Sequence, residues 1–110
     1  MAKALTRTQL GKLRLGLETE RTRILRVLKA QEAAALIEER GPEIEESAQR
    51  ATERDQGLGV LARERALLDE VDRALAKIDA GKYGVSERTG APIPYDRLAA
   101  VPWARKGIDE

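Results

Sequence analysis

The 110-residue chain is small, highly charged and free of cysteine and histidine, and its formal net charge is +1. Structural disulfides and ordinary zinc or haem sites are therefore excluded, and a reducing compartment fits this composition. The near-zero net charge gives no overall attraction to nucleic acid. The first residues contain no long apolar run, so we expect no signal peptide, no membrane span and a cytoplasmic location.

Charged and aromatic side chains are unevenly distributed along the chain. Residues 1–30 carry eight basic and two acidic side chains, whereas residues 31–80 carry seven basic and thirteen acidic ones. The only aromatic residues lie in the last 28 positions and are Tyr83, Tyr95 and Trp103. The first 80 residues therefore cannot build a thick globular core, and we expect long helices that pack along a narrow seam.

The first predicted element is a helix from about residue 8 to residue 40. Its apolar residues recur at three- and four-residue steps, and charged residues fill the other faces. The seam comprises Leu10, Leu13, Leu17, Ile24, Val27, Leu28 and Ala34. Gly41 and Pro42 then end this helix, since glycine suits the position after a helix and proline suits a following first turn.

A second helical pattern extends from about residue 44 to residue 80, after a tip at residues 41–43. Its seam comprises Ile44, Ala48, Ala51, Leu58, Leu61, Leu68, Val71, Leu75 and Ile78. Two glycines, Gly57 and Gly59, are expected to weaken one turn by roughly 1–2 kcal/mol. Gly81 ends the helix. We predict an all-α fold dominated by a long antiparallel helical hairpin over residues 1–80.

The last 30 residues, 81–110, predict a small loop-rich lobe. Pro92-Ile93-Pro94 is expected to be extended, and residues 97–101 to form a short helix that Pro102 ends. The aromatic and apolar residues of this segment suit either a ligand pocket or, as we prefer, the core of the lobe. They are Tyr83, Ile93, Tyr95, Leu98, Val101 and Trp103.

Four positions in this lobe have the spacing of a zinc site but not its ligands. Two residues separate Ser86 from Thr89, and two separate Gly107 from Glu110, as in C-x2-C motifs. Seventeen residues separate the two pairs. None supplies a thiolate or an imidazole, so we expect no metal and no cofactor. Structural zinc contributes on the order of 10 kcal/mol to folding. Packing of the aromatic residues is the expected replacement.

The predicted tip is acidic: five glutamates lie between residues 38 and 46, namely Glu38, Glu39, Glu43, Glu45 and Glu46. They suit either solvated helix ends or an acidic probe for a cation, a basic patch or a metal held by a partner. Catalysis is not expected, because the chain has no nucleophile–histidine pair, no P-loop and no pocket-forming residues beside its paired carboxylates.

Read together with the hairpin, the lobe resembles the DksA/TraR family of bacterial transcription regulators. Besides the ribbon-spaced positions, the matching stretches are Gly81-x-Tyr83-Gly84, Thr89-Gly90-x-Pro92-Ile93-Pro94 and Arg97-Leu98-x-Ala100-x-Pro102-x-Ala104. The resemblance covers residues 81–110 closely and residues 8–80 by architecture. It implies a hairpin with a zinc-ribbon lobe at its base, inserted into the secondary channel of RNA polymerase, and binding to that enzyme rather than to DNA.

The resemblance also implies roles for particular residues. The family's tip motif, Asp-x-x-Asp-x-Ala, falls on Glu43, Glu46 and Ala48 when counted back from Tyr83 without gaps. The two glutamates would act near the polymerase active centre, and Ala48 would allow close approach. The same count places Arg63 where the family uses a basic residue to grip the channel rim. The family's zinc does not carry over.

We therefore expect a monomeric, non-enzymatic transcription regulator that binds RNA polymerase, with no sequence-specific DNA binding and no membrane contact. Two alternatives remain open at this stage. One is a structural or adaptor coiled coil that pairs with another helical protein or with itself. The other is an auxiliary factor that uses its acidic tip to promote transcript cleavage by the polymerase.

Overall fold

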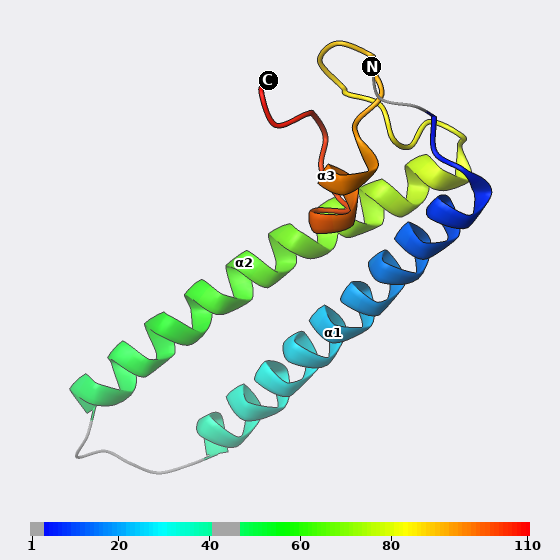
Figure 1. Cartoon of the computed structure of the whole chain (residues 1–110). Helices are drawn as coiled ribbons and strands as arrows, with labels where there is room; N and C mark the ends of the chain where they lie inside the picture. Colours follow the sequence, from blue (N-terminus) through cyan, green and yellow to red (C-terminus); the bar gives the residue numbers. More distant parts are fainter. Residues whose placement is uncertain (1–3, 41–46) are drawn as a thin grey trace. The chain divides into compact units, whose positions relative to one another are not determined.

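The computed structural model describes the backbone of residues 4–40 and 47–110, and the side chains of residues 4–37 and 56–110. These residues form three helices, α1 (Arg7–Arg40), α2 (Ser47–Asp79) and the short α3 (Tyr95–Ala100). The two long helices pack side by side and antiparallel (Figure 1), which confirms the predicted all-α hairpin. In the described part of the chain, no helix is both long and apolar enough to cross a membrane.

Helix α1 begins at Arg7 because of a reciprocal cap that the helical periodicity alone did not reveal. The backbone N–H of Gln9 donates to the hydroxyl of Thr6, and the backbone N–H of Thr6 donates to the amide oxygen of Gln9, both at 3.0 Å. This arrangement is a capping box, and its sequence signal is the Thr-x-x-Gln spacing.

Helix α2 is continuous through Gly57 and Gly59, so the expected weak turn remains helical. Its end matches the prediction. Gly81 has a φ of +72°, and its N–H donates to the carbonyl of Ile78, while the N–H of Lys82 donates to the carbonyl of Lys77. This pair of bonds is a Schellman motif, which requires a left-handed residue that glycine supplies without strain.

The chain divides into two compact units, here called the terminal unit (Met1–Arg21 with Asp69–Glu110) and the middle unit (Thr22–Leu68). In the terminal unit, the seam between α1 and α2 buries Leu13, Leu17, Val71 and Ala74. Ion pairs line its edges, with Arg14 2.6 Å from Asp79 and Arg21 2.7 Å from Asp72. In the middle unit, Ile24 is fully buried and Arg23 forms a bidentate pair with Glu64.

The lobe after α2 folds as a tight turn followed by α3. Val85 and Pro92 form an isolated antiparallel bridge, and the N–H of Ile93 donates to the carbonyl of Gly84 at 2.8 Å. Gly84 has a φ of +93°, and a Cβ placed there would lie 3.0 Å from Cδ1 of Leu5. Glycine is therefore required at position 84 both by the backbone conformation and by the close approach of the N-terminal segment.

The lobe differs from its prediction in two respects, the make-up of its core and the start of its helix. Ile93 and Leu98 are fully buried and pack with Leu13 of α1, with Tyr83 and Tyr95 at the edge of the cluster. Trp103 is only half-buried and lies outside this cluster, so the prediction that it belongs to the core was wrong. Helix α3 also begins at Tyr95, two residues earlier than predicted, and Pro94 precedes it as an N-cap residue with extended backbone (φ −59°, ψ 144°).

Candidate functional site

Most of the predicted tip lies outside the described residues. Glu43 and Glu46 fall in the segment 41–46, and the side chain of Ala48, near the start of α2, is also outside the description. Arg63 is exposed on α2 and forms no ion pair with another described residue. The roles assigned to these four residues therefore stay predictions.

The four positions with zinc-site spacing do come together, and a carboxylate joins them. The hydroxyl of Ser86 donates to Oε1 of Glu110 at 2.6 Å, and the N–H of Gly107 donates to Oε2 of the same carboxylate at 2.7 Å. Ser86 is 3% exposed, and its Oγ also accepts from the backbone N–H groups of Arg88 and Thr89. We call Ser86, Thr89, Gly107 and Glu110 the carboxylate bridge.

The chemistry of the carboxylate bridge does not fit zinc. Gly107 has no side chain, and hydroxyls are not among the thiolate, imidazole and carboxylate ligands that zinc takes in proteins. Hydrogen bonds from Ser86, from the backbone of Gly107 and, more weakly, from Thr89 lower the pKa of Glu110 below its ordinary value of 4.5. Among the described residues, no group of three or more acidic side chains could hold a metal ion.

A second cluster of charges joins the lobe to α2 within the terminal unit. Glu87 accepts from Lys77 and from Arg73, the latter through Nη2 at 2.6 Å and Nε at 3.1 Å. Arg105 donates from Nε to Glu70 at 2.8 Å, and its carbonyl accepts from the N–H of Glu87 at 2.8 Å. We call these five residues the lobe latch, because each of their ion pairs links the lobe to α2.

The ion pairs of the lobe latch lower the pKa of Glu87. Hydrogen bonds and charge from Lys77 and then Arg73 lower the pKa of Glu87 from its ordinary value of 4.5 to about 2. The carboxylate thus stays ionised across the physiological range. Sequence patterns do not reveal this cluster, because its paired residues lie 10 to 35 positions apart and meet only through the docking of the lobe.

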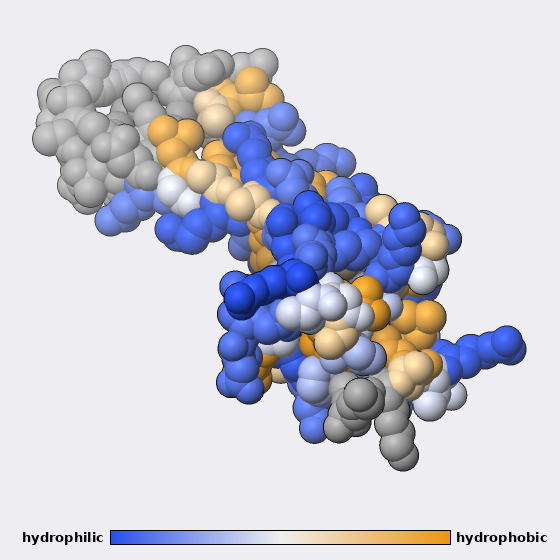
Figure 2. Space-filling model, turned by 90° about the horizontal axis from the view of Figure 1, so that it is seen from above, coloured by the Kyte–Doolittle hydropathy of each residue, from blue (hydrophilic) through white to orange (hydrophobic). Residues whose placement is uncertain are grey.

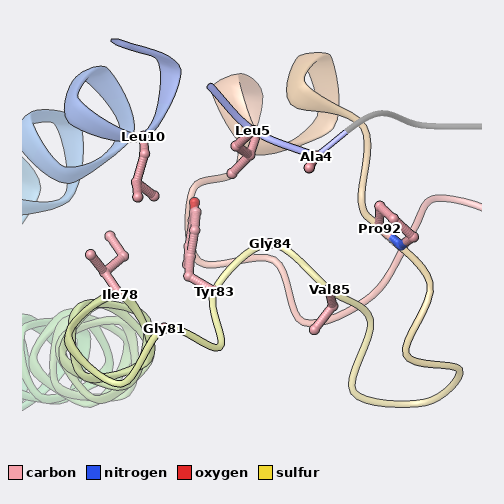
Figure 3. A pocket seen from close by; sticks show the side chains of 9 residues that line it. All are labelled: Ala4, Leu5, Leu10, Ile78, Gly81, Tyr83, Gly84, Val85 and Pro92. Carbon is pink, nitrogen blue, oxygen red and sulfur yellow. The ribbon is translucent and has the colours of Figure 1, made fainter. Parts of the chain in front are cut away.

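The terminal unit also contains an apolar cavity of about 260 Å³ between the N-terminal segment, α2 and the lobe. Figure 3 shows the side chains of Leu5, Leu10, Ile78 and Tyr83 around it. The Tyr83 hydroxyl donates to the carbonyl of Pro102 at 2.7 Å, and burial raises its pKa to about 12. With this hydroxyl already paired, the cavity offers no side-chain polar group to orient a ligand, and its lining is best explained as packing.

Comparison with solved structures identifies the family of this fold. Transcription factor DksA2 from Pseudomonas aeruginosa matches with a TM-score of 0.85 and 30% sequence identity, over 94% of this chain and 80% of that chain. The chain belongs to the DksA/TraR family. This result confirms the resemblance seen in the sequence, for a member that contains no cysteine. No family model matches the chain.

Curated relatives match shorter stretches. General stress protein 16O of Bacillus subtilis is 56% identical over 46 residues, which are 42% of this chain and 28% of that protein. The RNA polymerase-binding transcription factor DksA of Caulobacter vibrioides is 38% identical over 58 residues, which are 53% of this chain and 41% of that protein. The matches therefore span well under half the length of these relatives.

Proposed function

We propose that this protein is a non-catalytic regulator of transcription that binds RNA polymerase through its helical hairpin. The observation that carries the proposal is the match to DksA2 along nearly the whole chain. The name of the Caulobacter relative supports the choice of partner. A partner of this kind would place the protein in the cytoplasm, and we propose that it acts there as a monomer.

We further propose that the hairpin enters the secondary channel of the polymerase with its acidic tip first. Glu43 and Glu46 would supply the negative charge near the active centre, Ala48 would permit close approach, and Arg63 would contact the channel rim. Support for this assignment comes from the family's tip motif and from the exposure of Arg63 on α2. Recognition would then be of the polymerase itself and not of a DNA sequence.

Binding can be tested by co-purification of the intact chain with RNA polymerase core and holoenzyme at moderate salt. We expect a stable complex with both forms, since the channel belongs to the core enzyme. Absence of any complex with either form would refute the proposed function. DNA without polymerase should not be retained by the chain, whose net charge is close to zero.

The position of the tip can be tested by photo-cross-linking. A photoreactive residue at position 46 should cross-link to the polymerase subunits that line the secondary channel. The matched control carries the same residue at position 109, which is exposed in the lobe. Cross-links that come from position 109 and not from position 46 would show that the hairpin does not enter first.

A further inference from the structure

One carboxylate attaches residues 106–110 to the rest of the lobe. This stretch, drawn in red in Figure 1, forms neither helix nor strand. It contains no buried residue: Lys106 and Asp109 are exposed, and Ile108 is 74% exposed. Among the described residues, every hydrogen bond between this stretch and the preceding part of the lobe ends on the carboxylate of Glu110. The attachment of the stretch therefore depends on one ionised side chain.

The donors around this carboxylate are arranged as a binding site. Oε1 accepts from the hydroxyl of Ser86 at 2.6 Å, and Oε2 accepts from the N–H of Gly107 at 2.7 Å, so each oxygen has its own donor. These two hydrogen bonds are the main reason that the pKa of Glu110 lies below its ordinary value. The hydroxyl of Thr89 and the positive charge of Arg88 lower it further. Two donors, one for each oxygen, match the planar fork of a carboxylate.

The hydroxyl of Ser86 is oriented by residues other than Glu110. Its Oγ accepts from the backbone N–H groups of Arg88 at 3.1 Å and Thr89 at 3.2 Å. The N–H of Gly90 donates to the carbonyl of Ser86 at 2.8 Å and closes the turn. With its oxygen already accepting two bonds, the hydroxyl is left to act as a donor. The turn thus presents a prearranged donor, and Glu110 only supplies the acceptor.

The site favours an anion as the acceptor. Ser86 is 3% exposed, and a buried hydroxyl without an acceptor costs free energy. One carboxylate satisfies Ser86 and the N–H of Gly107 together, and the positive charge of Arg88 favours an anion over a neutral acceptor. Hydrophilic residues cover much of the visible face in Figure 2, with hydrophobic areas among them. Recognition of a charged side chain through hydrogen bonds suits a surface of this kind.

We propose that Ser86, Thr89 and the N–H of Gly107 form a binding site for a carboxylate, which Glu110 fills in this structure and which an acidic residue of a partner protein can take over. The contact of Glu110 is then autoinhibitory, because it closes the site to other carboxylates. Entry of the partner's side chain displaces Glu110 and loosens residues 106–110. This inference does not depend on the proposed function.

Competition with Glu110 favours a protein partner over a small free carboxylate. A side chain tethered beside its own site has an effective concentration in the millimolar range or above. A small carboxylate at a lower concentration therefore does not displace it. A partner protein adds further contacts, and the surface beside the site offers apolar ones: Val85, next to Ser86, is 40% exposed, and Ile108, next to Gly107, is 74% exposed.

Emptying the site provides the first test. Glu110→Ala removes the internal carboxylate, and the variant is titrated with sodium acetate at pH 7, with sodium chloride at equal ionic strength as the reference. We expect a saturable shift of the Gly107 amide in proton–nitrogen correlation NMR spectra, with a Kd in the millimolar range. Binding to the wild type should be at least tenfold weaker, because Glu110 fills the site. Asp109→Ala, at an exposed neighbour, should behave as the wild type.

Loss of a donor and a change of probe provide the second test. Addition of Ser86→Ala to Glu110→Ala should weaken acetate binding about tenfold, since one charge-assisted hydrogen bond is lost. Addition of Thr89→Val instead should weaken it a few-fold and leaves the Ser86 hydroxyl in place. The same spectra report whether each variant is folded. A blocked Gly-Glu-Gly peptide should bind Glu110→Ala as acetate does, and a blocked Gly-Gln-Gly peptide should not bind.

Three outcomes would overturn the inference. The site does not exist if Glu110→Ala shows no saturable shift, or if loss of the Ser86 and Thr89 hydroxyls leaves acetate binding unchanged. Tighter binding of inorganic phosphate than of acetate would show that the site is not a carboxylate site. Binding of acetate without binding of the glutamate peptide would exclude an acidic protein side chain as the ligand. None of these measurements contains RNA polymerase, so their failure is separate from that of the proposed function.

Discussion

At the scale of single residues, the zinc-site positions of this lobe contain a carboxylate held by hydrogen bonds. Ser86 and Glu110 lie 24 positions apart in sequence and meet at 2.6 Å. A charge-assisted hydrogen bond of this length fixes both partners in direction as well as in distance. The bridge thus joins the two turns that four zinc ligands would otherwise hold, although each of its bonds is far weaker than a metal–ligand bond.

Replacement of Glu110 tests the carboxylate bridge. Glu110→Gln replaces one carboxylate oxygen, which accepts a hydrogen bond, with an amide NH2 group, which donates one. Either the hydroxyl of Ser86 or the backbone N–H of Gly107 would then face a donor. We expect a melting temperature a few degrees below that of the wild type at pH 7. The control is Asp109→Asn, which changes an exposed neighbour. Equal melting temperatures for the two variants would show that the bridge contributes nothing to stability.

The pH dependence of the bridge has a definite sign. The pKa of Glu110 is lower in the folded chain than its ordinary value of 4.5. The ionised carboxylate therefore stabilises the fold above about pH 4.5, and this contribution is lost as the pH falls through the folded pKa. The Glu110→Gln variant should show a smaller loss of stability on acidification than the wild type.

At the scale of the elements, the lobe latch attaches the lobe to α2 through ion pairs between long side chains. Single exposed pairs contribute about 0–1 kcal/mol. Here, however, Glu87 is shared by Lys77 and Arg73, and its backbone binds Arg105, which pairs with Glu70. Loss of one member should therefore loosen several contacts together.

Glu87→Gln tests the lobe latch. The folded pKa of Glu87 is about 2, against an ordinary value of 4.5, so its stabilising effect is complete above pH 4.5 and is lost between there and pH 2. We expect the variant to melt below the wild type at pH 7 and to differ little from it at pH 2. Asp69→Asn is the control, because Asp69 is exposed on α2 and no ion pair links it to another described residue.

The glycines of α1 offer a stabilising change at the same scale. A Cβ added at Gly16 would meet no heavy atom within 4 Å, and the residue lies inside α1. Gly16→Ala should raise the free energy of unfolding by about 0.5–1 kcal/mol, because alanine loses less backbone entropy in a helix. Denaturant titration measures the gain. Gly84→Ala should have the opposite effect, since its φ is positive and Leu5 is close by.

At the scale of the whole molecule, the lobe folds around apolar residues instead of a metal. Ile93 and Leu98 pack with Leu13 of α1, so the lobe shares a core with that helix. The division of the chain at residue 80 into hairpin and lobe stays a prediction, and the terminal unit combines residues from both sides of that boundary.

Metal removal tests this view of the lobe. We expect EDTA to leave the thermal melt of the chain unchanged, because the carboxylate bridge does not supply zinc ligands. Leu98→Ala should lower the free energy of unfolding by about 2–5 kcal/mol, since Leu98 is fully buried. This variant shows that the assay detects a weakened lobe core, and Ile108→Ala, at a residue that is 74% exposed, is its neutral control. A melt that drops with EDTA would reveal a metal site.

The sequence by itself determined the elements that depend on local rules. Helical periodicity predicted both long helices, and the glycine at position 81 predicted the end of α2, because a left-handed position after a helix selects glycine. The motif stretches of the lobe predicted the family. The Thr-x-x-Gln cap at residues 6–9 was equally local, and its spacing alone would have located the start of α1.

Only the tertiary structure decided which distant side chains meet. Ser86 and Glu110 come from different segments of the chain, as do Glu87 and Lys77, and their contacts depend on how those segments dock. Periodicity fixes a residue's place on its own helix, but not the partner opposite it. The same reason explains why Trp103, the largest apolar residue, was wrongly assigned to a core that Ile93 and Leu98 form.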